Sequence, residues 1–211
     1  MGIQERRERE RAARRGAVLD AARGLLRENG FNGTTTKRIA QVCELSEATL
    51  FWYFQSKDEI FTSLLFEGIE FIGQGLRAIA ESEEPGDRAL ARVWRLFAQV
   101  RGEHPEYFQL FAYLAHPRST ASVSDDVIAE IARRSGDNFR IFADLLDQVG
   151  GAGRSRLVAD LLWGSFVGLS VLRDSRVNLG ARPHPTEEEL AAAFELLLSG
   201  IAPELAEGAG P

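Results

Sequence analysis

Apolar side chains recur at helical spacing along nearly the whole chain. The first series lies near the N-terminus and follows the i, i+3, i+4, i+7 pattern of an amphipathic helix: Val18, Ala21, Ala22, Leu25 and Leu26. The pair Asn29-Gly30 predicts the end of this helix, because glycine readily takes the left-handed conformation that closes one. No strand-like alternation or internal repeat accompanies these patterns, so we expect an all-α protein.

Hydroxyl side chains mark the starts of two short helices, since a hydroxyl oxygen can accept a hydrogen bond from a free backbone N–H. Thr34 or Thr35 can cap a helix over residues 36–43, and Ser46 can cap one over residues 46–53. Only two or three residues join the two helices. This spacing is typical of a helix-turn-helix, which presents its second helix to the major groove of DNA.

Longer helices fill the rest of the chain. Ser56 can cap a fourth helix that runs to about residue 80, and the stretch ESEEPGD after it marks a loop. Further helices are predicted over residues 87–102, 105–115, 124–149, 154–174 and 186–200. We therefore expect a three-helix helix-turn-helix DNA-binding domain over residues 11–66 and a helical domain over residues 67–202.

The predicted helix over residues 154–174 is apolar nearly all round, with Gly164 and Gly168 four residues apart. Such a helix must be covered on more than one side, and small residues let another helix approach closely. The last helix, over residues 186–200, also carries a wide apolar stripe. We expect these two helices to pack on their copies in a second subunit as a four-helix dimer interface. The alternative is that a monomer buries both.

The composition fits a soluble, cytoplasmic globular protein of 211 residues, of which 45% are hydrophobic and 27% charged. No apolar run reaches the roughly 18 residues that span a membrane, and the charged N-terminus is not a secretory signal. A single cysteine, Cys43, excludes an internal disulfide. Residues 1–60 hold 11 Lys and Arg against 9 Asp and Glu, whereas residues 61–211 hold 14 against 22. Either this asymmetry marks an N-terminal surface that faces a polyanion, or it is chance.

Helical spacing separates an inner from an outer side on the predicted helix over residues 46–53. Leu45, Leu50 and Phe54 lie on the inner side and can pack against the first helix. The outer side carries Glu47, Ala48, Trp52 and, in part, Tyr53. The Trp52 ring can either face DNA or pack on the fourth helix.

The stretch VLDAARGLLRENGFNGTTTKRIAQVCELSEATLFWYFQSKDEIF resembles the DNA-binding domain of the TetR (tetracycline-repressor-like) family of bacterial transcription regulators. The resemblance covers roughly residues 14–66 and rests on the following features together: Ala21-Ala22, Gly30-Phe31, the Thr pair, Ile39-Ala40, Thr49-Leu50, an aromatic residue at 51, Tyr53-Phe54 and Ser56-Lys57. Beyond this stretch only the all-helical architecture is similar.

The resemblance implies a homodimer that binds a near-palindromic double-stranded DNA operator. It also implies that a small, largely apolar effector enters the C-terminal domain and releases the operator, with repression as the default. The residues that it places on DNA are Thr35, Lys37, Glu47, Ala48, Thr49, Trp52, Tyr53 and Lys57. Of these, Glu47, Ala48 and Trp52 would face base edges, whereas Thr49, Tyr53 and Lys57 would hold phosphates.

The sequence departs from the family pattern at two positions. Glu44 stands where the family has a glycine in the turn, and a non-glycine residue at positive φ costs on the order of 1 kcal/mol. Phe51 replaces the usual tyrosine and lacks its hydroxyl, so we expect it to pack rather than to touch DNA. The arginines of the segment ERRERERAARR can enter an adjacent minor groove, or the segment is a solvated helix with interleaved glutamates.

Large apolar side chains in the second domain can line an effector cavity or simply form a core. The candidates for effector contact are Phe66, Trp94, Phe97, His104, Phe108, Phe111, Tyr113, Phe142, Trp163 and Phe166. Three histidines without i, i+4 pairing and one cysteine give no metal site, and no cofactor is expected. Neither a phosphate-binding glycine loop nor a nucleophile motif is present, so an enzyme is not expected. A DNA-binding architectural protein without an effector is the alternative function.

Overall fold

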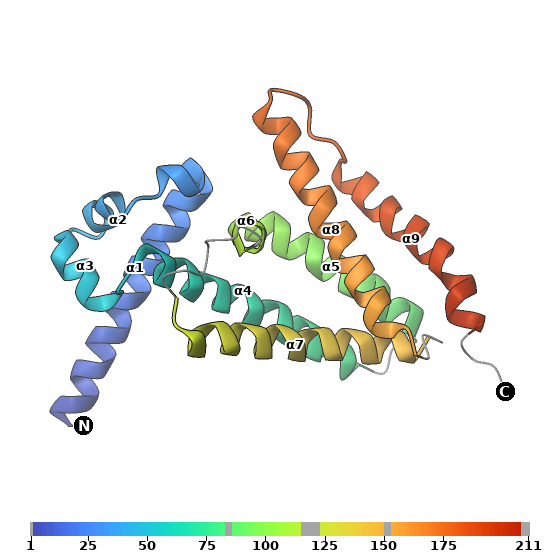
Figure 1. Ribbon diagram of the computed structural model, residues 1–211, viewed down its shortest axis with the longest axis horizontal. Coiled ribbons are helices and arrows are strands. Elements are labelled where there is room, and N and C mark those ends of the chain that lie inside the picture. Colours follow the sequence, from blue (N-terminus) through green and yellow to red (C-terminus); the bar gives the residue numbers. More distant parts are fainter. Residues whose placement is uncertain (1, 83–85, 115–122, 150–152, 208–211) are drawn as a thin grey trace. The chain divides into compact units, whose positions relative to one another are not determined.

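The computed structural model describes residues 2–82, 86–114, 123–149 and 153–207 (Figure 1). The helices are α1 (Ile3–Gly33), α2 (Thr36–Val42), α3 (Glu47–Tyr53), α4 (Lys57–Ala80), α5 (Gly86–Glu103), α6 (Pro105–Leu114), α7 (Asp125–Asp147), α8 (Ser155–Asn178) and α9 (Glu187–Glu207). These residues contain no strand, and the expected all-α class is confirmed.

The helices form two compact units. The first contains α1, α2, α3, α6 and the part of α4 up to Gly68, and the second contains the rest of α4, α5, most of α7, α8 and α9. In sequence, α6 lies within the predicted second domain. In the structure it belongs to the first unit, where Tyr107 of α6 packs on Gly68 of α4. A methyl group added to Gly68 would lie 2.7 Å from the Tyr107 ring, so glycine permits this close crossing. The domain limits 11–66 and 67–202 stay a prediction.

Local hydrogen bonds fix the ends of the first helices as their sequences predict. Gly30 interrupts α1 with a φ of 63°. Thr35, rather than Thr34, caps α2, because its hydroxyl oxygen accepts a hydrogen bond from the Arg38 N–H at 3.2 Å. The Ser46 hydroxyl accepts one from the Thr49 N–H at 3.0 Å and caps α3.

The turn between α2 and α3 contains the expected strained residue. Glu44 has a φ of 55°, in the left-handed region that glycine enters without strain. The N–H of the next residue, Leu45, donates to the Ala40 carbonyl oxygen at 2.8 Å and closes the turn. A glutamate thus occupies the glycine position of the family, and the surrounding helices hold it there.

One apolar core joins α1, α2 and α3. Its members are exposed by 2% or less, and they are Val18, Ala22, Leu26, Ile39, Ala40, Leu50 and Phe54. Each large apolar side chain buried in this way contributes about 1.5–3 kcal/mol. Leu50 and Phe54 thereby fix which side of α3 faces inward, as the helical spacing predicts.

The core of the second unit is built from aromatic rings. Phe97 lies 5.8 Å from Phe142 and 5.7 Å from Phe166, measured between ring centroids. Trp94 packs edge-on against Phe166 at 4.9 Å. Its indole N–H donates to the Leu190 carbonyl oxygen at 2.9 Å, which satisfies the buried donor and ties α5 to α9.

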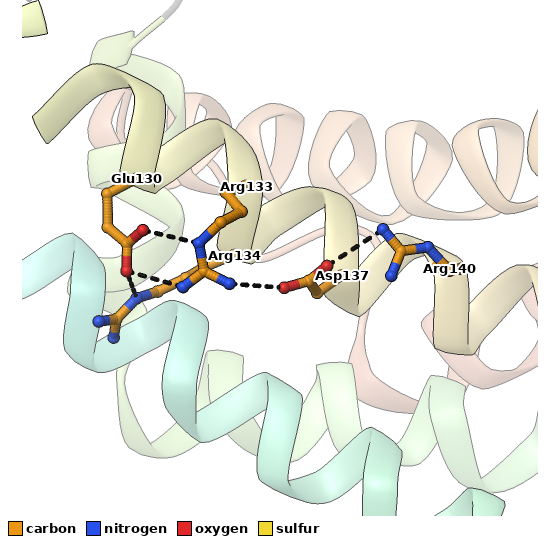
Figure 2. Close-up of polar contacts among 5 residues, drawn as sticks. All are labelled: Glu130, Arg133, Arg134, Asp137 and Arg140. Atoms are coloured by element: carbon orange, nitrogen blue, oxygen red, sulfur yellow. Dashed lines mark hydrogen bonds and ion pairs between the residues drawn. The ribbon is translucent and has the colours of Figure 1, made fainter. Parts of the chain in front are cut away.

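The exposed side of α7 carries a row of alternating charges at i, i+3 and i, i+4 spacing (Figure 2). Glu130 accepts hydrogen bonds from Arg133 at 2.7 Å and from Arg134 at 2.6 Å, and these bonds lower its pKa to about 2. Asp137 bridges Arg133 and Arg140. Such pairs, three or four residues apart, are typical of a helix side that faces solvent.

Among the described residues, α8 is long and apolar enough to cross a membrane by length and composition alone, since an 18-residue window of it has a mean hydropathy of 1.3. The sequence expectation concerned an uninterrupted apolar run, and in α8 such a run extends only from residue 161 to residue 172, between Asp160 and Arg173. A core helix of a soluble protein passes the same test.

Candidate nucleic-acid interface

The outer side of α3 is open to solvent. Its exposed residues are Glu47, Ala48, Thr49, Phe51 and Trp52, and Tyr53 is half-buried. Trp52 is 64% exposed, so it does not take the alternative position packed on α4. Its ring contacts Tyr53 edge-on at 4.8 Å and lies 5.2 Å from the Arg11 guanidinium of α1. A large ring thus stands on the surface of a short, firmly packed helix.

The expectation for Phe51 is wrong, because the ring is 46% exposed instead of packed. Leu50 and Phe54 are four residues apart and take the whole inner side of α3. Phe51 is displaced by about 100° around the helix axis from Leu50. The helix is only 7 residues long, so no neighbouring turn covers the ring.

Several polar residues of the candidate interface already have partners inside the protein. The Glu47 carboxylate accepts a hydrogen bond from the Thr36 hydroxyl at 3.0 Å, which links the starts of α2 and α3. The hydroxyls of Thr49 and Ser46 lie 2.8 Å apart. Thr35 uses its hydroxyl oxygen as the α2 cap. Lys37 is exposed beside it. The bonds of Glu47, Thr49 and Thr35 fix the orientation of these three side chains within the protein.

Lys57 is half-buried at the start of α4. Its ammonium group donates to the Phe31 carbonyl oxygen in the last turn of α1 at 2.9 Å and lies 5.0 Å from the Phe61 ring. Burial lowers the pKa of Lys57. An ammonium group has three N–H donors, so this bond leaves donor capacity for a phosphate.

Arg15 joins α1 to the end of α3, a role that the sequence pattern did not indicate. Its guanidinium donates to the Tyr53 carbonyl oxygen, pairs with Glu59 at 3.5 Å and covers the Phe54 ring at 4.0 Å. The residue belongs to a run of arginines, and nothing in that run distinguishes it from its neighbours. Through these contacts α1 fixes the position of the exposed helix.

Two clusters attach α6 to the same unit. Glu106 is fully buried, with Arg23 at 3.7 Å and Arg27 at 3.8 Å from its carboxylate oxygens. Tyr113 stacks on Phe31 at 4.6 Å, and its hydroxyl donates to the Asp58 carboxylate at 2.9 Å. Burial and this hydrogen bond raise the pKa of Tyr113 to about 12.

The candidate effector residues fall into both units. Phe66, Phe108, Phe111 and Tyr113 belong to the first, and Trp94, Phe97, His104, Phe142, Trp163 and Phe166 belong to the second. Within the second unit, Trp94, Phe97, Phe142 and Phe166 make the core contacts described above. Their contact with an effector stays a prediction.

A short helix, a tight turn and an exposed second helix packed on α1 define a helix-turn-helix DNA-binding fold. Residues 18–64 match the family model described as bacterial regulatory proteins, tetR family. This stretch is therefore similar to that family of bacterial regulatory proteins.

Two transcriptional regulators of Escherichia coli K12 are similar to the chain. The HTH-type regulator RutR is 29% identical over 106 residues, which cover 50% of each protein, so the chain spans about half the length of RutR. The HTH-type regulator UidR is 25% identical over 193 residues, which cover 87% of this chain and 90% of UidR.

Solved structures share the fold over most of the chain. The TetR family regulator PfmR from Thermus thermophilus has a TM-score of 0.67 at 20% identity and covers 86% of this chain and 97% of its own. The ketosteroid transcriptional regulator KstR2 of Mycobacterium tuberculosis has a TM-score of 0.63 at 19% identity, and the match covers 90% of this chain and 94% of KstR2. At these identities the likeness extends to the fold alone.

Proposed function

We propose that the protein is a cytoplasmic, homodimeric repressor that binds a near-palindromic operator and releases it when a small, largely apolar effector binds. The observation that carries the DNA-binding part is the exposed side of α3. Ala48 and Trp52 stand in solvent on a helix whose other side is anchored by fully buried Leu50 and Phe54.

The contacts divide into base readout and phosphate binding. Ala48 and Trp52 would touch base edges or thymine methyl groups, and Glu47 would accept a hydrogen bond from a cytosine amino group. Phosphates would be held by Thr49, Tyr53 and Lys57, while Thr35 and Lys37, at the start of α2, would contact the DNA backbone or a base near it. Phosphate contacts set the register on DNA, whereas base contacts select the sequence.

Exposed apolar side chains on α8 support the dimer. Leu157, Leu161 and Leu172 are 58%, 49% and 50% exposed. Gly164 and Gly168 lie between them, and a methyl group added at either would meet no described atom within 4 Å. The helix therefore offers an apolar stripe with small residues at its centre, which suits close packing on a second copy. Leu196 of α9 is 72% exposed and extends the apolar surface of this unit.

Effector control would act as a population shift. In a dimer the two α3 helices must fit successive major grooves about 34 Å apart. An effector that favours a different separation lowers the affinity for the operator. Candidate transmitting elements are α4, which runs through both units, and α6, whose Tyr113 contacts Phe31 and Asp58.

The proposal is tested by selecting bound duplexes from a random DNA library and measuring their affinity with and without candidate effectors. We expect a palindromic site, a sedimentation mass of two chains, and loss of binding with an apolar compound that raises the melting temperature. Binding without sequence preference and without any stabilising compound would instead indicate an architectural protein. Selection of a non-palindromic site by a monomer would contradict the dimer.

A further inference from the structure

The N-terminal part of α1 carries a basic stripe that lies outside the family match of residues 18–64. Gln4, Arg7, Arg11 and Arg14 are spaced by three or four residues and therefore share one side of the helix. Together with Trp52 and Tyr53 they line a groove of about 890 Å³ between α1 and the end of α3. In Figure 1, this part of α1 extends past α3 as a continuous helix.

The charges of this stripe are not neutralised by ion pairs. Among the described residues, no carboxylate pairs with Arg7, Arg11 or Arg14. By contrast, Arg6 pairs with Glu10 at 3.0 Å, and the Arg9 side chain donates to the Glu5 carbonyl oxygen at 3.3 Å. Two carboxylates, Glu8 and Glu10, also line the groove and reduce its positive charge. The three arginines nevertheless leave an excess of positive charge there.

The stripe has a fixed position relative to α3. Arg15 binds the Tyr53 carbonyl oxygen and Glu59, which holds α1 against the end of α3. One helical turn earlier, the Arg11 guanidinium lies over the Trp52 ring. Residues 4–14 span about 15 Å of helix axis, which matches the rise of about four nucleotides of one DNA strand.

We propose that Gln4, Arg7, Arg11 and Arg14 bind the DNA phosphate backbone beside the major groove that α3 occupies. This inference rests on the proposed DNA-binding function and adds a second contact surface to it. The geometry favours phosphates over the minor groove. A helix with side chains is about 10–12 Å wide, whereas the minor groove is about 6 Å wide, so α1 cannot enter it as a helix. Phosphates carry no sequence information, so the stripe adds affinity without specificity.

A pair of double variants tests this inference. R7A/R14A removes two charges from the stripe and keeps Arg11 against Trp52, while R6A/R9A removes two charges from elsewhere on the same helix turns. All four side chains are exposed on a helix, and alanine is a good helix former, so both variants are expected to fold. Circular dichroism checks this. Binding is measured by fluorescence anisotropy at several salt concentrations on the selected operator and on an unrelated duplex of equal length.

For R7A/R14A we expect the slope of log affinity against log salt to fall by about 1.8, since each phosphate contact contributes about 0.9. The ratio of operator to unrelated affinity should not change. R6A/R9A should keep the wild-type slope within a few tenths. If both variants lower the slope equally, the effect is one of net charge and the stripe is not a contact. If R7A/R14A keeps the wild-type slope, the inference fails while the proposed function stands. If the wild-type protein binds neither duplex, both fail.

Discussion

Lys57 offers a sharp test of the interface because its ammonium group has a partner inside the protein. The group donates to the Phe31 carbonyl oxygen at 2.9 Å and lies over the Phe61 ring. The sequence resemblance assigns the same group to a DNA phosphate. The substitution Lys57→Met keeps most of the aliphatic chain and removes the charge, so it separates the two roles when stability and DNA binding are both measured.

The loss of stability follows from the contacts of the ammonium group. A hydrogen bond from a charged donor contributes about 1.5–3 kcal/mol, and the lower value applies because Lys57 is half-buried. The cation over the Phe61 ring adds about 0.5 kcal/mol. We expect Lys57→Met to lower the free energy of unfolding by about 2 kcal/mol in urea denaturation. A domain of ordinary stability, about 5–15 kcal/mol, stays folded after this loss.

The effect on DNA is separate from the effect on stability. If Lys57 also holds a phosphate, the variant should bind all duplexes more weakly, and its salt slope should fall by about 0.9. Arg140→Met is the control, because it removes an exposed charge from α7 in the second unit. An unchanged salt slope with reduced stability would refute the phosphate contact and leave Lys57 as a structural link between α1 and α4.

Three further results are expected. Gly68→Ala should destabilise the protein by about 1–3 kcal/mol, since the new methyl group would lie 2.7 Å from the Tyr107 ring. Gly24→Ala is the control, because the space around Gly24 is open, and it should not destabilise the protein. Equal melting temperatures of the two variants would contradict the close crossing of α4 and α6. The difference between the ultraviolet titrations of the wild type and Tyr113→Phe should show Tyr113 ionising near pH 12 rather than 10. Because the pKa of Tyr113 is raised in the folded protein, the stability that Tyr113 contributes is present below pH 10 and is lost as the pH rises towards 12. Leu161→Glu should halve the sedimentation mass of the dimer, while Val42→Glu, a similarly exposed apolar position on α2, should leave it unchanged; a dimer that tolerates Leu161→Glu would place the interface elsewhere.

Features that depend on neighbouring residues could be predicted from the sequence. The starts of α2 and α3 follow from the hydroxyls of Thr35 and Ser46, because a cap acts over three residues. The inner side of α3 follows from the spacing of Leu50 and Phe54. The positive φ of Glu44 could also be anticipated, since this residue stands where the TetR family usually has a glycine.

Features that depend on contacts between residues far apart in the chain have no local sequence pattern that predicts them. The attachment of α6 to the first unit rests on Gly68 meeting Tyr107 and on Glu106 meeting two arginines of α1. Gly68, Tyr107 and Glu106 do not stand out from the other residues of their own helices. The exposure of Phe51 could not be predicted because it depends on what lies beside α3, and that is set by the fold rather than by the helix period.

The contacts of α6 also constrain how an effector could act. Glu106 is fully buried beside Arg23 and the half-exposed Arg27, and removing one partner of a buried ion pair costs about 3–5 kcal/mol. Typical allosteric coupling energies are only about 1–3 kcal/mol. We therefore expect an effector to leave α6 attached to α1 at this point. In the proposed mechanism α6 and α1 move together, and because Arg15 of α1 holds the end of α3, the recognition helix moves with them.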